Sequence, residues 1–205
     1  MRVTHSIKIV RTDMKGRPAK VLGVTAMRQA MSIAGRQKLG LRNKAIILLS
    51  FKAGLRAGEI AALRWEMLLD ATGRVGRFIE LPARVAKKGS GRRIPISPEL
   101  LAVLGQLLRE RHTHEGPVIR SSRGRHMTAK AVVNWFTALY RNAGLEGCSS
   151  HSGRRTFVTR AARLITRAGG SLRDVQQLAG HRSIQTTQGY IEGDAQAQHR
   201  LVRMI

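Results

Sequence analysis

The chain of 205 residues is long enough to bury a substantial core, and 42% of its residues are hydrophobic. It carries 37 Lys and Arg against 12 Asp and Glu, a formal net charge of +25, which favours a polyanionic partner such as nucleic acid. The single cysteine, Cys148, excludes an internal disulfide framework, and the sequence has no apolar run that suits a membrane span or a signal peptide.

Basic residues are frequent in residues 1–24, which show little helical period and are interpreted as a basic N-terminal arm. A helix is predicted next, with Thr25 as its N-cap and a break at Gly35. The apolar run RNKAIILLSFKA predicts a second helix, ended by Gly54. The segment RAGEIAALRWEML predicts a third, half-buried helix, because its apolar residues fall near one face.

Between Asp70 and Ile96 the pattern is that of short strands joined by turns. GRFIEL, RVAKK and RRIPI are the candidate strands, and the GSG link before RRIPI suits a hairpin. Together with the helical segments on either side, these strands predict a fold that is mainly α with a small antiparallel β-sheet (α+β).

Helical signals return at Ser97, an N-cap followed by a proline at the first helical position and by an acidic first turn. The segment TAKAVVNWFTALYRNAG predicts an amphipathic helix that stops at Gly144. Three more helices are predicted, from Ser152 to about Ala168, from Ser171 to about Ala179 and from Ser183 to about Ile191. The large aromatic residues expected in the core are Trp65, Trp135 and Phe136.

Six residues from distant parts of the chain have the chemistry to hold and cut a phosphodiester. They are Arg56, Lys87 or its neighbour Lys88, His151, Arg154, His181 and Tyr190. A phosphodiester is an anion whose transition state gathers charge on its non-bridging oxygens, and the planar fork of an arginine matches two such oxygens. Arg56 and Arg154 suit this role, with His151 and His181 as hydrogen-bond donors or proton carriers. Because His151 and Arg154 are three residues apart, they fall on one face of a predicted helix N-terminus, which also favours an anion.

A tyrosine and a lysine complete this chemistry. The hydroxyl of Tyr190, whose ordinary pKa of about 10 falls in positive surroundings, is a candidate nucleophile. A phosphotyrosyl ester preserves the energy of the broken bond, so rejoining needs no ATP. The leaving 5′-oxygen needs a proton, which a lysine on the hairpin loop supplies as general acid, and both Lys87 and Lys88 lie in that loop.

Simpler interpretations exist for each residue alone, since a lone histidine or tyrosine usually belongs to the core and a basic run is usually solvated. Because all six residues occur together and in this order, we favour the interpretation that they form one site for cleaving a phosphodiester. The arginines interpreted as phosphate contacts or solvated faces are Arg64, Arg92, Arg93, Arg155 and Arg182. Metal catalysis is rejected, because spacings such as Cys148-x-x-His151 lack further matching ligands, and no cofactor is expected.

The order and spacing of these residues, including His-x-x-Arg and LAGHRSIQTTQGY, resemble the catalytic domain of the tyrosine recombinases, the phage integrase family, from about Thr25 to Ile191. The resemblance implies a site-specific DNA recombinase or integrase of the kind carried by mobile elements, which cleaves and rejoins strands through a 3′-phosphotyrosine without metal or ATP. It divides the chain into the arm 1–24, a catalytic domain 25–191 and a C-terminal tail 192–205. It also favours Lys87 over Lys88 as general acid, because Lys87 lies eight residues before Pro95.

The resemblance further implies that Glu59 orients Arg56. Its implied partners are double-stranded DNA, further copies of this chain in a homo-tetramer on DNA, and an accessory DNA-bending protein, with a cytoplasmic, nucleoid-associated location and no membrane. The family's separate core-binding domain is expected to be absent, because about 24 residues precede the first predicted helix.

Two alternative functions share the same residues. A type IB topoisomerase-like enzyme would use the same chemistry to relax supercoiled DNA that carries no specific site. A non-catalytic DNA-binding regulator derived from the same fold would bind DNA in a salt-sensitive way and form no covalent adduct.

Overall fold

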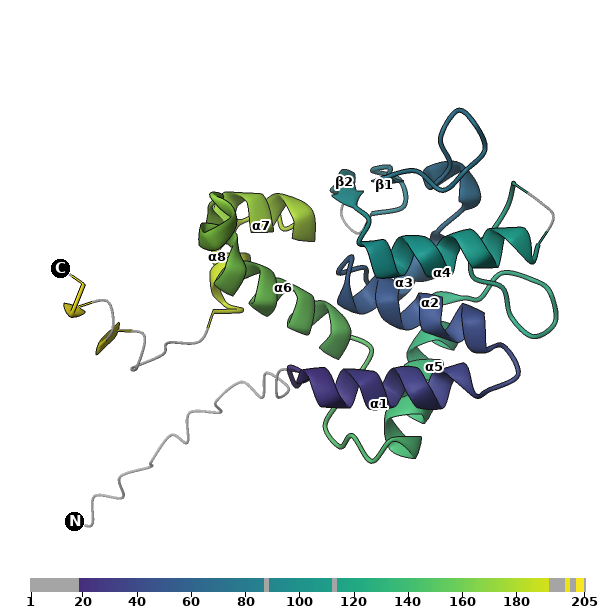
Figure 1. Cartoon of the computed structure of the whole chain (residues 1–205), viewed down its shortest axis with the longest axis horizontal. Coiled ribbons are helices and arrows are strands. Elements are labelled where there is room, and N and C mark those ends of the chain that lie inside the picture. The colour runs from purple at the N-terminus through teal and green to yellow at the C-terminus, as the bar shows by residue number, and fades with distance from the viewer. Residues whose placement is uncertain (1–18, 87–88, 112–113, 192–197, 200–201, 205) are drawn as a thin grey trace, which may run out of the picture.

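The computed structural model describes residues 19–86, 89–111, 114–191, 198–199 and 202–204 (Figure 1). The described chain is mostly helical with one two-stranded antiparallel sheet, as the sequence predicts. Its elements, in order, are α1 (Val24–Gly35), α2 (Gly40–Phe51), α3 (Ala57–Ala62), the 3₁₀ turn η1 (Trp65–Met67), β1 (Phe78–Leu81), β2 (Arg92–Pro95), α4 (Pro98–Arg109), α5 (Ala129–Asn142), α6 (Ser152–Leu164), the 3₁₀ turn η3 (Ile165–Ala168), α7 (Leu172–Ala179) and α8 (Ile184–Gln188).

Helix α2 is the centre of the larger hydrophobic core. Its residues from Ala45 to Leu49 are fully buried, as expected for a helix that is apolar on nearly all sides. Helices α1, α4 and α6 pack around it, and α5 packs against α3 (Figure 1). Trp65 and Phe136 are buried in this core as predicted, whereas Trp135 lies at its edge, partly exposed.

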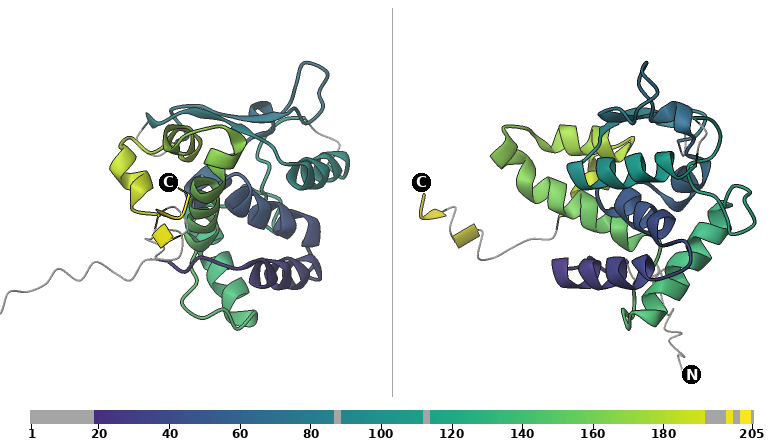
Figure 2. Two further views of the ribbon diagram at one scale, coloured as in Figure 1. Left: turned by 60° about the vertical axis from the view of Figure 1, so that its left-hand side comes forward. Right: turned by 45° about the vertical axis from the view of Figure 1, so that its right-hand side comes forward.

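A second, smaller core lies between α6 and α7. Its buried residues are Val158, Val175 and Ala179, and the ring of Tyr190 packs at its edge. Helices α7 and α8 lie together on one side of the molecule in both Figures 1 and 2. Helix α6 joins the two cores, because it crosses α2 at Gly153, where an added Cβ would overlap the side chains of Ser50 and Phe51.

The predicted helix starts at Ser97 and Ser171 are confirmed, because capping side chains form hydrogen bonds there. The Ser97 hydroxyl accepts from the Leu100 N–H at 3.4 Å, and the Ser171 N–H donates to Asp174 Oδ2 at 2.7 Å. The prediction of Thr25 as an N-cap is wrong. Helix α1 begins two residues earlier than this cap predicts, with Gly23 as N-cap, and no capping side chain fixes its start.

The predicted continuous helix RAGEIAALRWEML is broken. Helix α3 ends at Ala62, and Leu63 has extended backbone angles. The Leu63 carbonyl accepts from the Val118 N–H at 2.9 Å, and the Trp65 N–H donates to the Gly116 carbonyl at 3.0 Å. These bonds to a distant segment replace the next helical turn, and η1 follows.

The predicted strand RVAKK is also wrong over its described part. Strand β1 pairs directly with β2, in the register Leu81 opposite Arg92. The N–H groups of Val85 and Ala86 both donate to the Pro82 carbonyl, so this segment is a turn with no free ladder donors there. Lys87 and Lys88 lie outside the described residues.

No helix within the described ranges is both long and apolar enough to span a bilayer.

Candidate active site

Arg56 stands at the first turn of α3, where its backbone and side chain are both held by Glu59. The Arg56 N–H donates to Glu59 Oε2 at 2.9 Å, and Arg56 Nη1 donates to Oε1 at 2.9 Å. The Glu59 side chain is 2% exposed, whereas that of Arg56 is 21% exposed. Glu59 therefore orients Arg56, as the resemblance implies, and leaves part of the guanidinium accessible.

Glu59 is shared with a second arginine, Arg92, at the start of β2. Arg92 Nη1 donates to Oε1 at 3.0 Å and Nη2 donates to Oε2 at 2.9 Å. Burial alone would raise the pKa of the Glu59 carboxyl, but the hydrogen bonds and charge of Arg92, joined by those of Arg56, lower it to about 2. Glu59 is therefore ionised at neutral pH.

The prediction that Arg92 is solvated is wrong, because its side chain is 5% exposed and donates hydrogen bonds to Glu59 and to the Leu178 carbonyl. The alternation within RRIPI is the signal that was available. It places Arg92 on the same face as the buried Ile94, and Arg93 on the other face. Arg93 is solvated as predicted; it pairs with Glu80 at 2.7 Å and lies over the ring of Phe78.

Arg154 is buried on α6 and is fixed by two backbone carbonyls. Its Nη1 donates to the Gly54 carbonyl and its Nη2 to the Ala179 carbonyl, both at 2.6 Å. Burial, followed by the charge of Arg56, lowers the pKa of the Arg154 guanidinium to about 10, although the Glu59 carboxylate acts in the opposite direction. Arg154 therefore stays charged at neutral pH and lies within the electrostatic reach of Arg56.

His181 follows α7 directly after Gly180, which adopts a left-handed conformation with φ of 62°. Its ring is buried, and Nδ1 lies 2.9 Å from Thr187 Oγ1. Burial, followed by the charge of Arg154 and then Arg56, lowers the pKa of the His181 ring to about 4. The imidazole is therefore neutral near pH 7 and carries one N–H.

Tyr190 lies just beyond α8 and is half-buried. Its N–H donates to the Thr187 carbonyl at 3.0 Å, and its own carbonyl accepts from Thr159 Oγ1 at 3.2 Å. The aromatic ring stacks on that of His181, and the Arg155 guanidinium lies 5.5 Å from the ring centroid. Positive and aromatic groups thus surround the candidate nucleophile.

The structure gathers four of the six predicted residues in one place: Arg56, Arg154, His181 and Tyr190. His151 is the N-cap of the same helix as Arg154, and its side chain is exposed. Lys87 lies outside the described residues. Among the residues that the structure describes, no group of three or more His, Cys, Asp or Glu side chains is placed to hold a metal ion.

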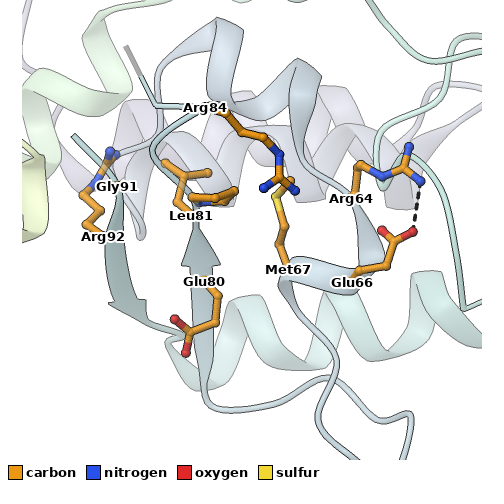
Figure 3. Close-up of a pocket in the computed structure, with 9 residues that line it drawn as sticks. Arg64, Glu66, Met67, Glu80, Leu81, Arg84, Gly91 and Arg92 are labelled. Carbon is orange, nitrogen blue, oxygen red and sulfur yellow. Dashed lines mark hydrogen bonds and ion pairs between the residues drawn. The ribbon is translucent and has the colours of Figure 1, made fainter. Parts of the chain in front are cut away.

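A hollow of about 670 Å³ opens between β2 and α7, beside these residues. Its lining includes the neutral ring of His181, one acidic residue, Asp174, and four arginines, Arg92, Arg93, Arg173 and Arg182. A second hollow, of about 700 Å³, lies against β1 and η1 (Figure 3) and carries both signs of charge. There Arg64 pairs with Glu66 at 2.9 Å, and Glu80 and Arg84 also line the wall. With four arginines against one acidic residue, the first hollow is a better match to a polyanion than the second, which has three arginines against Glu66 and Glu80.

Comparison with known proteins places these residues in a family. The model of the phage integrase family matches residues 20–197. Tyrosine recombinase XerC of Shewanella amazonensis is 32% identical over 182 residues, which cover 86% of this chain and 57% of that protein. Tyrosine recombinase XerD of Lacticaseibacillus casei is 31% identical over 159 residues, covering 74% of this chain and 50% of the relative. The chain thus spans about half the length of these relatives.

Solved structures give the same fold. The XerA recombinase crystal structure matches 91% of this chain and 66% of its own, with a TM-score of 0.70 and 24% identity. The Tn1549 transposon integrase in complex with transposon right end DNA matches 93% of this chain and 67% of its own, with a TM-score of 0.71 and 19% identity. At these identities the likeness establishes the fold alone.

Proposed function

The chain belongs to the phage integrase family, and we propose that it is a site-specific DNA recombinase that cuts a DNA strand and joins it to another through a 3′-phosphotyrosine. The observation that carries this proposal is the convergence of Arg56, Arg154, His181 and Tyr190 from three separate segments. Its curated relatives named above are tyrosine recombinases.

Arg56 and Arg154 hold the scissile phosphate in this mechanism. Their guanidinium groups are fixed before substrate arrives, Arg56 by Glu59 and Arg154 by the Gly54 and Ala179 carbonyls. A guanidinium has five N–H donors, so these bonds leave others for phosphate oxygens. Donors fixed in advance stabilise the developing charge without reorganising during the reaction.

Tyr190 is the nucleophile. Its hydroxyl gives up its proton to His151, the proposed proton carrier, and its oxygen forms a bond to phosphorus while the bond from phosphorus to the 5′-oxygen breaks. Neutral His181, which lies against the tyrosine ring, offers one N–H to the phosphate, and His151 is proposed as a second donor or proton carrier. Attack by a free 5′-hydroxyl on the phosphotyrosine reverses these steps and joins the strands.

Lys87 is proposed as the general acid that protonates the leaving 5′-oxygen, on the strength of the family resemblance. It belongs to the link between β1 and β2, and β2 also supplies Arg92 beside Glu59. The catalytic domain is proposed to comprise residues 25–191, between the arm 1–24 and the tail 192–205.

Double-stranded DNA is the proposed substrate. A net charge of +25 and the arginine-lined hollow beside His181 both suit a polyanion. Structures with the same fold include a lambda integrase dimer bound to a core site and XerH bound to its difH substrate. We propose a homo-tetramer on two DNA sites, helped by a DNA-bending protein, in the cytoplasm with the nucleoid.

A trapped covalent adduct tests the proposal. Nicked duplexes carrying inverted repeats from DNA that flanks the gene, with a 5′ label on the cleaved strand, are incubated with the full chain and resolved under denaturing conditions. Wild type should retain label as a protein–DNA adduct. Tyr190→Phe should bind the same duplexes and retain none, because only the nucleophilic oxygen is removed.

Equal adduct from wild type and Tyr190→Phe would exclude Tyr190 as the nucleophile. Salt-sensitive binding with no adduct from wild type on any of these duplexes would favour a DNA-binding regulator instead. Efficient relaxation of supercoiled plasmids that lack the repeats would favour a topoisomerase.

A further inference from the structure

We propose that Arg92 is a positioning residue of the active site, which fixes Glu59 and takes up part of its charge so that Arg56 can bind phosphate. This inference rests on the strand-transfer function proposed above. Arg92 itself is directed to Glu59 and to the end of α7, so its action on the substrate passes through Arg56.

Both oxygens of Glu59 are divided between the two arginines. Oε1 accepts from Arg56 Nη1 at 2.9 Å and from Arg92 Nη1 at 3.0 Å. Oε2 accepts from the Arg56 N–H at 2.9 Å and from Arg92 Nη2 at 2.9 Å. The bidentate interaction of Arg92 fixes the plane of the Glu59 carboxylate. That plane sets the direction from which the carboxylate holds Arg56.

Charge balance gives Arg92 a second effect. A carboxylate paired with Arg56 alone would form a neutral pair and weaken the attraction of that arginine for a phosphate. Arg92 makes the group two cations and one anion, with a net charge of +1. The accessible member of the three is Arg56, whose side chain is 21% exposed, against 5% for Arg92 and 2% for Glu59. The remaining positive charge is therefore presented through Arg56.

A third bond ties the same arginine to the other half of the site. Arg92 Nε donates to the Leu178 carbonyl at 2.9 Å, and Arg154 Nη2 donates to the next carbonyl, that of Ala179. Cations at a helix C-terminus are favoured by the helix dipole. A Cβ at Gly180 would lie 2.9 Å from Arg92 Nη1, so glycine there lets the guanidinium lie against the turn that leads to His181.

Stability alone is a weak explanation for this arrangement. Burying an ion pair costs desolvation free energy, and a well-packed apolar pair often stabilises a fold as well or better. Arg92 and Ile94 share the inward face of β2, so an apolar residue at position 92 would continue the strand pattern. A positioning role accounts for the buried charge at this place.

The test compares Arg92→Met with Arg77→Met at saturating nicked DNA, measuring the single-turnover rate of adduct formation. Arg77 is the matched control, because it is an exposed arginine directly before β1 that lines neither of the two hollows. We expect Arg92→Met to slow cleavage by about 10- to 100-fold, with DNA affinity within about 2-fold of wild type. Arg77→Met should cleave at the wild-type rate. A wild-type rate in folded Arg92→Met would overturn the inference.

Epistasis separates positioning from a general structural loss. If Arg92 acts through Arg56, the double variant Arg56→Met/Arg92→Met should cleave no more slowly than Arg56→Met. Rate losses that multiply would overturn the inference. Arg92→Lys keeps the charge and loses the fork, so its rate should lie between those of wild type and Arg92→Met.

A folding defect in Arg92→Met has its own control. Glu59→Gln/Arg92→Met removes both buried charges, and circular dichroism checks its fold; it should fold and remain slow, and a wild-type rate would overturn the inference. If wild type forms no adduct, that result contradicts the proposed function itself. A wild-type adduct together with an unaffected Arg92→Met rate would reject only the role of Arg92.

Discussion

The ring of Tyr190 stacks on the ring of His181, with centroids 5.4 Å apart and planes inclined by 22°. Tyr190 packs against the small core between α6 and α7, and His181 follows α7 directly, whereas Arg56 begins α3, whose Ile60 belongs to the large core around α2. Arg154 reaches both sides, with one bond to Gly54 and one to Ala179. The candidate nucleophile and the phosphate-binding groups are thus aligned by polar bonds between two packing units.

Acid should destabilise the folded chain in two steps. The pKa of His181 is lowered from 6.5 to about 4, so the unfolded state binds more protons between these values, and the free energy of unfolding falls as the pH drops from 6.5 to about 4. The pKa of Glu59 is lowered from 4.5 to about 2, so its stabilisation is lost as the pH falls from 4.5 toward 2. Urea denaturation at a series of pH values measures both. His181→Gln should flatten the upper step and leave the lower one, and an unchanged upper step would contradict the assignment.

Arg154→Met should lose both stability and cleavage. The substitution leaves the Gly54 and Ala179 carbonyls without their buried donor, which costs about 1–3 kcal/mol for each unsatisfied group. It also removes a guanidinium from the phosphate site. Chemical denaturation and adduct formation measure the two effects. Arg163→Met, on the exposed side of the same helix, is the control and should change neither.

Thr187→Val should slow cleavage while the fold is kept, because valine matches the size of the fully buried threonine but cannot bond His181 Nδ1. The threonine hydroxyl selects which ring nitrogen carries the proton and so the direction of the N–H. We expect a rate loss of about 10-fold, because the N–H donor of His181 is misdirected and not removed. Thr187→Ser restores the hydroxyl and should recover most of the rate; failure of serine to do so would point to packing of the methyl group.

Lys87→Ala should slow cleavage of ordinary DNA and be rescued by a substrate with sulfur at the bridging 5′ position. The pKa of a thiol, ordinarily about 8.5, is far below that of the alcohol that it replaces, so the thiolate departs without a general acid. Lys88→Ala is the matched control and should cleave both substrates at the wild-type rate. Rescue of Lys88→Ala in place of Lys87→Ala would exchange the two roles.

Local chemistry explains what the sequence predicted well. The starts of α4, α5 and α7 follow from serine or threonine caps that act within three residues, at Ser97, Thr128 and Ser171. The small sheet and the position of His181 after a glycine turn are equally local. The family resemblance supplied the set of site residues, and the structure brings Arg56, Arg154, His181 and Tyr190 together.

Contacts between distant segments explain the features that could not be predicted from the sequence. The helix after Arg56 is cut short because Leu63 and Trp65 bond to residues 116–118, and nothing near Leu63 in sequence indicates this. The burial of Arg92 depends on Glu59, 33 residues earlier, and on Leu178, 86 residues later. Neither partner is marked in the sequence around Arg92.

Arg92 and Arg154 hold backbone carbonyls as well as the site, so their loss would loosen the chain whether or not it still cuts DNA. Tyr190 is half-buried, and within the described part of the chain its side chain makes no comparable hydrogen bond to the backbone of a distant helix. A descendant that abandoned strand transfer would thus be free to change the tyrosine first and would keep the arginines longest. Among degenerate copies in a genome, retained arginines are therefore poor evidence of a working enzyme, and the residue to inspect is the tyrosine.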